Sequence, residues 1–258
     1  MRRISALGDD MYGKIYNLLS QTSRHPKIVK NSKVGILGAI MHLAPADDSG
    51  YEVCPMRSKG CTEACLNQAG FHYAKIQRAR INRTKMFFED RDKFMLMLAK
   101  EIRNLCNRAE KKGFIPGVRL NGTSDIPWER IPHSTYPNMM AAFPKVKFMD
   151  YTKRWNRKNL PANYRLIFSR SEDNYKHCVA ALENGMNIAV VFLDTLPKKA
   201  SIGGQVLRVI DGDEHDWRYG DYDDYPDERV IVGLRAKGLK AKQDTSGFVL
   251  NIKKQVAA

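Results

Sequence analysis

The sequence has no apolar run long enough to span a membrane and no lipidation motif. Cysteine is scarce: there are five, an odd number that does not suit a disulfide framework, and no export signal stands at the start of the chain. These absences argue against a membrane protein and against a disulfide-rich secreted one. We therefore expect reduced cysteines, no membrane partner and a location in the cytoplasm.

Acidic residues are also scarce, because 28 Asp and Glu stand against 43 Lys and Arg, a formal net charge of +15. Hydrophobic residues make up 43% of the chain, which is enough for a full core. No repeat and no low-complexity linker divides the sequence, so we expect a single α/β domain over residues 1–258. The excess of positive charge favours a polyanionic partner, either nucleic acid or a phosphate-bearing small molecule. The oligomeric state cannot be read from these patterns.

The most specific motif is a group of three cysteines, Cys54, Cys61 and Cys65, spaced C-x6-C-x3-C. They follow an apolar run at 34–43 that is typical of a buried strand, and we expect them to occupy a loop at 44–70. Three thiolates in one loop suit an iron–sulfur cluster, with zinc as the alternative metal and no metal as the third interpretation. Iron–sulfur clusters and zinc sites usually take four ligands, so a fourth position would be left for a substrate, a cofactor or a more distant residue.

The two remaining cysteines have a different context. Cys106 and Cys178 each lie in a helical pattern, where a lone cysteine is usually a small packed hydrophobe. We leave both out of the predicted site, although either could supply a fourth ligand.

Short apolar runs alternate with polar loops and helical segments in the second half of the chain. The runs predict strands at 115–120, 145–149, 164–168, 187–193, 206–210 and 229–234. Helical patterns precede the first of these strands and fill 173–184. Strand, loop, helix and strand in succession are typical of parallel units. We therefore predict a partial or complete parallel (β/α) barrel, preceded by a basic helical extension at 1–32.

Polar side chains follow the predicted strands directly. The carboxyl ends of parallel strands meet at one mouth of a barrel, so we expect these side chains to surround a common site. We predict catalytic roles for Asp125 and Lys153. The predicted substrate-binding residues are Asn121, Ser124, Ser169, Arg170, Asp211, Asp213 and Lys237.

The acidic segment at 211–216 admits three interpretations: a solvated turn, a substrate-binding loop or a second metal site. His42 and His215 could act as ligands or carry protons, but a lone histidine is more often structural. Neither histidine is included in the predicted site.

A buried strand, a three-cysteine loop and further strand–helix units together resemble the radical S-adenosylmethionine enzymes. In that superfamily three cysteines hold a 4Fe-4S cluster, and the cofactor occupies the remaining iron position. The usual spacing there is C-x3-C-x2-C, which differs from C-x6-C-x3-C here. The resemblance implies a 4Fe-4S cluster on the three cysteines, with S-adenosylmethionine as a second cofactor if the different spacing allows it.

A second resemblance is to a bacteriophage and prophage protein family of the gene-product-eighty-eight type. The motifs that carry it are the cysteine segment at 54–66, the segments at 119–125 and 211–218, and the segment at 232–238. They span most of the chain. The resemblance implies a phage-encoded protein in the host cytoplasm and no particular reaction.

These patterns favour an iron–sulfur enzyme, of redox or radical type, acting on a nucleotide, a nucleic acid or another anionic substrate. The alternative is a non-enzymatic protein, in which iron–sulfur or zinc stabilises the loop and the basic surface binds nucleic acid. A phage protein that binds a host factor is a third possibility. The polar residues at the strand ends favour the enzyme, because a loop that is only stabilised needs none of them.

Overall fold

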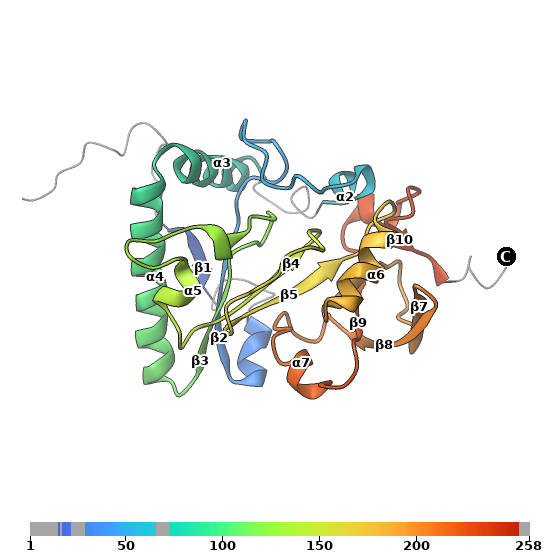
Figure 1. The fold of residues 1–258 in the computed structure, drawn as a ribbon. Coiled ribbons are helices and arrows are strands. Elements are labelled where there is room, and N and C mark those ends of the chain that lie inside the picture. Colours follow the sequence, from blue (N-terminus) through green and yellow to red (C-terminus); the bar gives the residue numbers. More distant parts are fainter. Residues whose placement is uncertain (1–14, 16, 22–28, 66–72, 253–258) are drawn as a thin grey trace, which may run out of the picture.

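Ten strands form one sheet in the computed structural model, which describes residues 15, 17–21, 29–65 and 73–252. Figure 1 shows the sheet running through the middle of the molecule. The strands are β1 (Leu19–Gln21), β2 (Ile36–Met41), β3 (Ile115–Arg119), β4 (Lys147–Thr152), β5 (Tyr164–Ser169), β6 (Asn187–Phe192), β7 (Lys199–Ile202), β8 (Gln205–Asp211), β9 (Ile231–Arg235) and β10 (Val249–Leu250). All the strands expected from apolar runs are present.

The sheet is open and mostly parallel. Its order is β1-β2-β3-β4-β5-β6-β9-β8-β7, with β10 paired to the end of β6. In this order, each strand from β2 through β9 to β8 is parallel to the next. The edge strand β1 is antiparallel to β2, and the edge strand β7 is antiparallel to β8. A closed barrel requires the first and last strands to pair. Here they form opposite edges, so the prediction of a complete barrel is wrong and the α/β class with a parallel core is confirmed.

The helical segments of the described residues are η2 (Lys30–Val34), α2 (Lys59–Glu63), α3 (Tyr73–Glu89), α4 (Arg91–Lys111), η4 (Trp128–Arg130), α5 (Met139–Ala142), α6 (Tyr175–Glu183), α7 (Asp221–Asp224) and α8 (Leu239–Lys242). Helices α3, α4, α5 and α6 bury side chains in the main core on one face of the sheet. The longest, α4, starts at Asp90, whose carboxylate accepts a hydrogen bond from the Lys93 backbone. It ends before Gly113, which adopts the positive φ typical of a helix end. Its apolar side chains, among them Phe94, Leu98, Ile102 and Leu105, are buried in the core.

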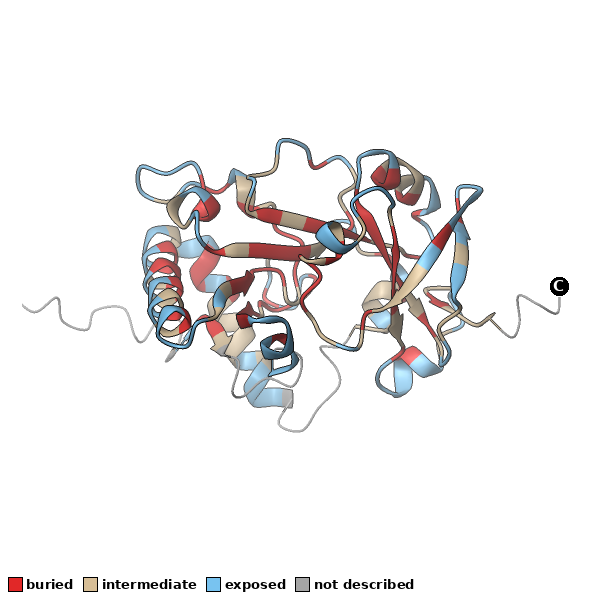
Figure 2. Cartoon of the chain, turned by 90° about the horizontal axis from the view of Figure 1, so that it is seen from below, coloured by how far each residue is buried: buried red, intermediate tan, exposed pale blue. Residues whose placement is uncertain are grey.

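Both faces of the central strands are buried, as Figure 2 shows in red. Successive side chains of a strand point to opposite faces. Phe148 and Phe168 therefore join the main core on the helical face, whereas Met149 and Ile167 point to the other face. Trp217, from the segment after β8, packs on this second face. Burial on both sides explains why the central strands are continuous apolar runs.

The predicted basic helical extension lies largely outside the described residues. Within the described part, Leu19–Gln21 is the edge strand β1 and Lys30–Val34 is the short helix η2. The backbone N–H groups of Leu18 and Leu19 donate hydrogen bonds to the carboxylate of Glu101 on α4. In the part of the chain that the structure describes, no helix combines the length and the apolar character needed to cross a membrane.

Candidate functional site

A cavity of about 690 Å³ lies at the carboxyl ends of the parallel strands. Its position follows from strand alternation, because Tyr151 lies two residues beyond Met149 and therefore points to the face that carries Trp217. Neighbouring strands contribute side chains from the same face. They are Arg119 on β3, Tyr151 on β4, Ser169 on β5, Val191 on β6 and Leu234 on β9. The sheet thus gathers strand-end residues at one place without closing into a barrel.

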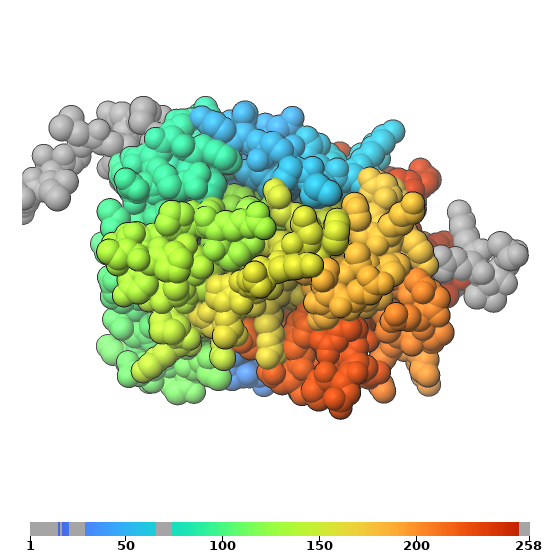
Figure 3. Space-filling model, viewed as in Figure 1, coloured from blue at the N-terminus to red at the C-terminus, as the bar shows by residue number. Residues whose placement is uncertain are grey.

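The three clustered cysteines line this cavity together. Cys54 lies in the loop before α2, Cys61 within α2 and Cys65 just after it. Figure 3 shows the cysteine segment, in blue to cyan, forming the surface beside the yellow segments that follow β4 and β5. The Cys54 thiol donates a hydrogen bond to the carbonyl of Thr123 at 3.6 Å. Burial raises the pKa of Cys54 to about 12, so the metal-free side chain is a thiol at neutral pH.

The short helix α2 is fixed by contacts at its N-terminus. The Ser58 hydroxyl accepts a hydrogen bond from the backbone N–H of Cys61 at 3.1 Å and donates one to Glu172 at 2.8 Å. The other carboxylate oxygen of Glu172 accepts from the backbone N–H of Gly60 at 2.7 Å. Glu172 follows β5, so a strand-end residue of the parallel sheet positions the helix that carries Cys61.

The described residues include no group of three or more His, Cys, Asp or Glu side chains placed to hold a single metal ion. A zinc site needs its sulfurs about 2.3 Å from one ion, and that arrangement is not preformed here. An iron–sulfur cluster binds its cysteines through different iron atoms and suits thiols that share a cavity without meeting at one point.

The other cysteines lie elsewhere. Cys178 on α6 is fully buried in the main core, where its thiol lies 3.5 Å from the side-chain oxygen of Asn174. Cys106 on α4 packs against the same core. Neither lines the cavity: Cys178 is buried, and Cys106 is half-buried against the core.

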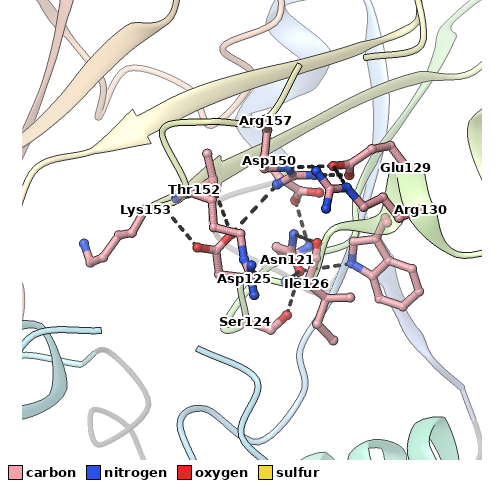
Figure 4. A network of polar contacts seen from close by, with 12 residues as sticks. Asn121, Ser124, Asp125, Ile126, Glu129, Arg130, Asp150, Thr152, Lys153 and Arg157 are labelled. Carbon is pink, nitrogen blue, oxygen red and sulfur yellow. Dashed lines mark hydrogen bonds and ion pairs between the residues drawn. The ribbon is translucent and has the colours of Figure 1, made fainter. Parts of the chain in front are cut away.

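Asn121 and Ser124, predicted to bind substrate, lie next to the cavity in a network of hydrogen bonds that Figure 4 shows. The Asn121 amide oxygen accepts from the Ser124 hydroxyl at 2.9 Å, the Trp128 indole at 3.0 Å and the Ile126 backbone at 3.1 Å. Its amide nitrogen donates to the Ile126 carbonyl at 2.9 Å. These contacts occupy the Asn121 side chain with the loop after β3.

Asp125, predicted to be catalytic, is 7% exposed and binds the end of β4. One carboxylate oxygen accepts from the Thr152 hydroxyl at 2.7 Å, and the other accepts from the Lys153 backbone N–H at 2.9 Å. Arg157 lies 3.8 Å from the first oxygen. Asp125 thereby connects the loop after β3 to the loop after β4, and it lines the cavity without a free carboxylate oxygen.

Lys153 differs from its neighbours, because its side chain extends away from the Asp125 network in Figure 4. It is 9% exposed, and its ammonium makes one long contact of 3.5 Å with the Ser169 carbonyl. The ammonium also lies 5.5 Å from the centre of the Phe248 ring. Arg170 instead donates to the carbonyls of Gly247 and Phe248 at 2.7 and 3.0 Å, which anchors the segment before β10 to the cavity.

The acidic segment after β8 is occupied by nearby cations. Arg235 on β9 bonds to both Asp211 and Asp213, and Lys237 contacts Asp213 at 2.6 Å. The hydrogen bonds from Arg235 hold the pKa of Asp211 below its usual range. Burial opposes ionisation of Asp213, but the hydrogen bonds from Lys237 and Arg235 outweigh burial and lower its pKa. Asp213 and Lys237 line the cavity, whereas Asp211 does not. These ion pairs favour the substrate-binding or structural loop over a second metal site.

Comparison with known proteins gives one result. The family model described as Gene product 88 matches residues 17–252. The chain belongs to the Gene product 88 family. No curated protein and no solved structure matches the chain. The phage-type resemblance is thus confirmed, whereas the resemblance to radical S-adenosylmethionine enzymes is not supported.

In this member of the Gene product 88 family, several residues that shape the cavity were not predicted from the sequence. Arg119 lines the cavity and forms an ion pair with Asp216. Its place in the cavity could have been predicted from its position at the end of β3, because side chains alternate between the two faces of a strand. Glu172 and Phe248 left no comparable signal, because their roles depend on loops that meet only in the folded chain. His215 lines the cavity beside Arg218, and burial lowers its pKa.

Proposed function

We propose that the chain is an iron–sulfur enzyme of redox or radical type that acts on a nucleotide or another anionic molecule. The observation that carries the proposal is that Cys54, Cys61 and Cys65 line the same cavity as the polar residues of the parallel strand ends. Cysteines that only stabilised a loop would have no reason to face such a cavity. A pocket of about 690 Å³ is within the range that small-molecule sites occupy.

In this proposal Cys54, Cys61 and Cys65 hold a 4Fe-4S cluster. Such a cluster supplies single-electron transfer, and with three protein ligands it leaves one iron position for a substrate, a cofactor or another ligand. The neutral thiol of Cys54 has to lose its proton when the metal binds, so loading should improve as pH rises. Glu172 and Ser58 keep α2 in place for Cys61.

The remaining cavity residues provide the binding site. Val191, Leu234 and Phe248 give it apolar walls that exclude water. Lys153 supplies a positive charge that no carboxylate of the described residues neutralises. An environment of low polarity strengthens the attraction between such a charge and a substrate anion.

The test is anaerobic purification followed by iron and sulfide analysis and an absorption spectrum. We expect brown protein with near-stoichiometric iron and sulfide. Cys61→Ala should remove the cluster, whereas Cys178→Ala, which changes a buried cysteine away from the cavity, should retain it. Colourless protein with one zinc per chain would contradict the proposal, and so would retention of iron by Cys61→Ala.

A second candidate is a metal-stabilised protein that binds nucleic acid. The observation in its favour is a row of exposed basic side chains on the outer surface of α4, which stands at the left edge of the molecule in Figure 1. In that case the cysteines would only stabilise their loop, and the basic surface would contact phosphates. Binding to a host factor is the remaining alternative of this non-enzymatic class.

A further inference from the structure

Lys153 is the most unusual charge in the cavity. A lysine ammonium has three N–H donors, and within the described part of the chain the Lys153 ammonium has one hydrogen-bond acceptor, the Ser169 carbonyl at 3.5 Å. The side chain is 9% exposed, and no ion pair includes it among those found in the described residues. Burying an unpaired charge is costly, and proteins rarely do so without a reason. Such a group is poised to bind an anion.

The other cations of the cavity already have acceptors. Arg119, Arg235 and Lys237 pair with aspartates of the segment after β8. Arg57 pairs with two acids of the cysteine loop, and Arg170 donates to two backbone carbonyls. Lys30 donates to the carbonyl of Asp213 at 2.7 Å. Lys153 has the longest contact among these cations and is therefore the one best placed to bind an anionic group.

Apolar side chains form part of the cavity that Lys153 lines. The Phe248 ring lies 5.5 Å from its ammonium, and Val191 and Ala241 belong to the same apolar group as Phe248. All of them line the cavity, together with Leu234. A ligand that fits this surface has a polar end and an apolar or aromatic body.

We propose that the ligand of the cavity is a small organic anion whose single anionic group binds the Lys153 ammonium and whose apolar body lies against Val191, Leu234 and Phe248. The inference rests on the proposed function only in taking this cavity as the working site. It narrows the substrate to a carboxylate or a phosphate monoester. A polynucleotide strand is disfavoured, because its affinity depends on many phosphate contacts.

The test uses anilinonaphthalene sulfonate, which has one anionic group on an aromatic body, and the uncharged N-phenylnaphthylamine. Calorimetric titration of the full-length chain should show one site for the anionic probe. Lys153→Met keeps the length of the side chain and removes the charge, and it should weaken the anionic probe by about tenfold or more. The same variant should bind the uncharged probe as the wild type does.

Lys30→Met is the matched control, because it removes a lysine of the same cavity whose ammonium already donates a hydrogen bond to the Asp213 carbonyl at 2.7 Å. It should weaken the anionic probe by less than about threefold. Near-UV circular dichroism confirms the fold of each variant. Lys153→Met should also raise the melting temperature, since it removes an unpaired buried charge. A lower melting temperature would mean that Lys153 has a structural partner and would overturn the inference.

Competition identifies the anion. Displacement of the probe by phenyl phosphate or by phenylacetate would support a phosphate monoester or a carboxylate, respectively, and displacement by neither would contradict the assignment. Equal binding of the anionic probe by wild type and Lys153→Met would also overturn it. If Lys153→Met alters iron content but not probe affinity, the cluster and not a ligand is the partner of Lys153, which refutes the inference alone. Lys153-dependent binding in a protein without iron would refute the proposed function alone.

Discussion

Buried polar side chains just beyond β3 and β4 bond mainly to one another. Asn121 has four hydrogen bonds within its own loop, and the backbone N–H of Asn121 donates to Asp150 at 2.8 Å. Asp125 bonds to Thr152 and to the backbone of Lys153. A fully connected network of this kind specifies loop conformation. The network therefore holds the backbone of Lys153 in place without using its ammonium group.

Asp150 is expected to make stability depend on pH. It is fully buried, and burial raises its pKa from 3.8 to about 7 despite Arg119 and two hydrogen-bond donors nearby. The folded state then binds the proton more tightly than the unfolded state. The stabilisation from this group is complete below about pH 4 and is lost as pH rises through about 7, by up to ~1.4 kcal/mol per pH unit.

Urea denaturation at several pH values checks this prediction with Asp150→Asn, which cannot titrate. The unfolding free energy of the wild type should fall relative to that of the variant between pH 4 and 7. Asp92→Asn, on the exposed surface of α4, is the control and should follow the wild type. Parallel pH profiles for wild type and Asp150→Asn would show that Asp150 titrates normally.

At the scale of residues, the sequence predicts which side chains follow the strands but not which hydrogen-bond partners they have. Asn121, Ser124 and Asp125 were predicted at the site and do line the cavity. Asp125 binds the backbone after β4, whereas the Lys153 side chain faces the cavity. This difference depends on the paths of two loops. Loop paths are set by tertiary contacts, which composition and periodicity do not contain.

At the scale of elements, α2 depends on a close approach by Gly60. A Cβ atom added there would lie 2.1 Å from the Ser246 Oγ and 2.8 Å from the Phe248 Cβ. Gly60→Ala should therefore push α2 away from the segment before β10, lowering the unfolding free energy by about 1–3 kcal/mol. In the proposed enzyme it should also lower the iron content, since α2 carries Cys61.

Chemical denaturation and iron analysis of the same preparation measure both effects. Lys59→Ala is the control, because Lys59 lies in α2 with a side chain that is 85% exposed. It should retain the iron content and nearly all of the stability. Normal stability and iron content in Gly60→Ala would mean that α2 has room to shift without affecting the site.

The strands were easier to predict than their edges. Apolar runs identified the central strands because both of their faces are buried. The hairpin of β7 and β8 was missed, although Gly203 and Gly204 both have positive φ and form a recognisable turn signal. β10 is two residues long and pairs only with the end of β6. Two residues carry no periodicity, so no pattern in the sequence could reveal it.

At the scale of the whole molecule, strand order decided the shape. The hairpin returns β8 to the sheet beside β9, and β9 lies between β8 and β6. β7 thereby becomes an edge far from β1, and closure is prevented. The sequence contained the alternation of strands and helices but not this order. The shared cavity survives, because parallel strands bring their carboxyl ends to one edge of an open sheet as well as of a barrel.

The net charge of +15 leads to the last prediction. Four exposed basic side chains of α4 lie within about 80° of one another around the helix axis. They are Lys93, Lys100, Arg103 and Lys111. If this surface contacts nucleic acid, replacing the four by Gln should weaken binding of a labelled oligonucleotide. The dependence of affinity on salt should also become less steep, because fewer counterions are released.

Fluorescence anisotropy at several salt concentrations measures both quantities, and each lost phosphate contact should reduce the salt slope by about 0.7–0.9. Lys153→Met is the control, because the buried lysine of the cavity does not belong to the α4 surface, and it should leave oligonucleotide binding unchanged. Binding that is absent from the wild type at low salt would assign the excess charge to solubility. An unchanged slope in the α4 variant would place the nucleic-acid surface elsewhere on the molecule.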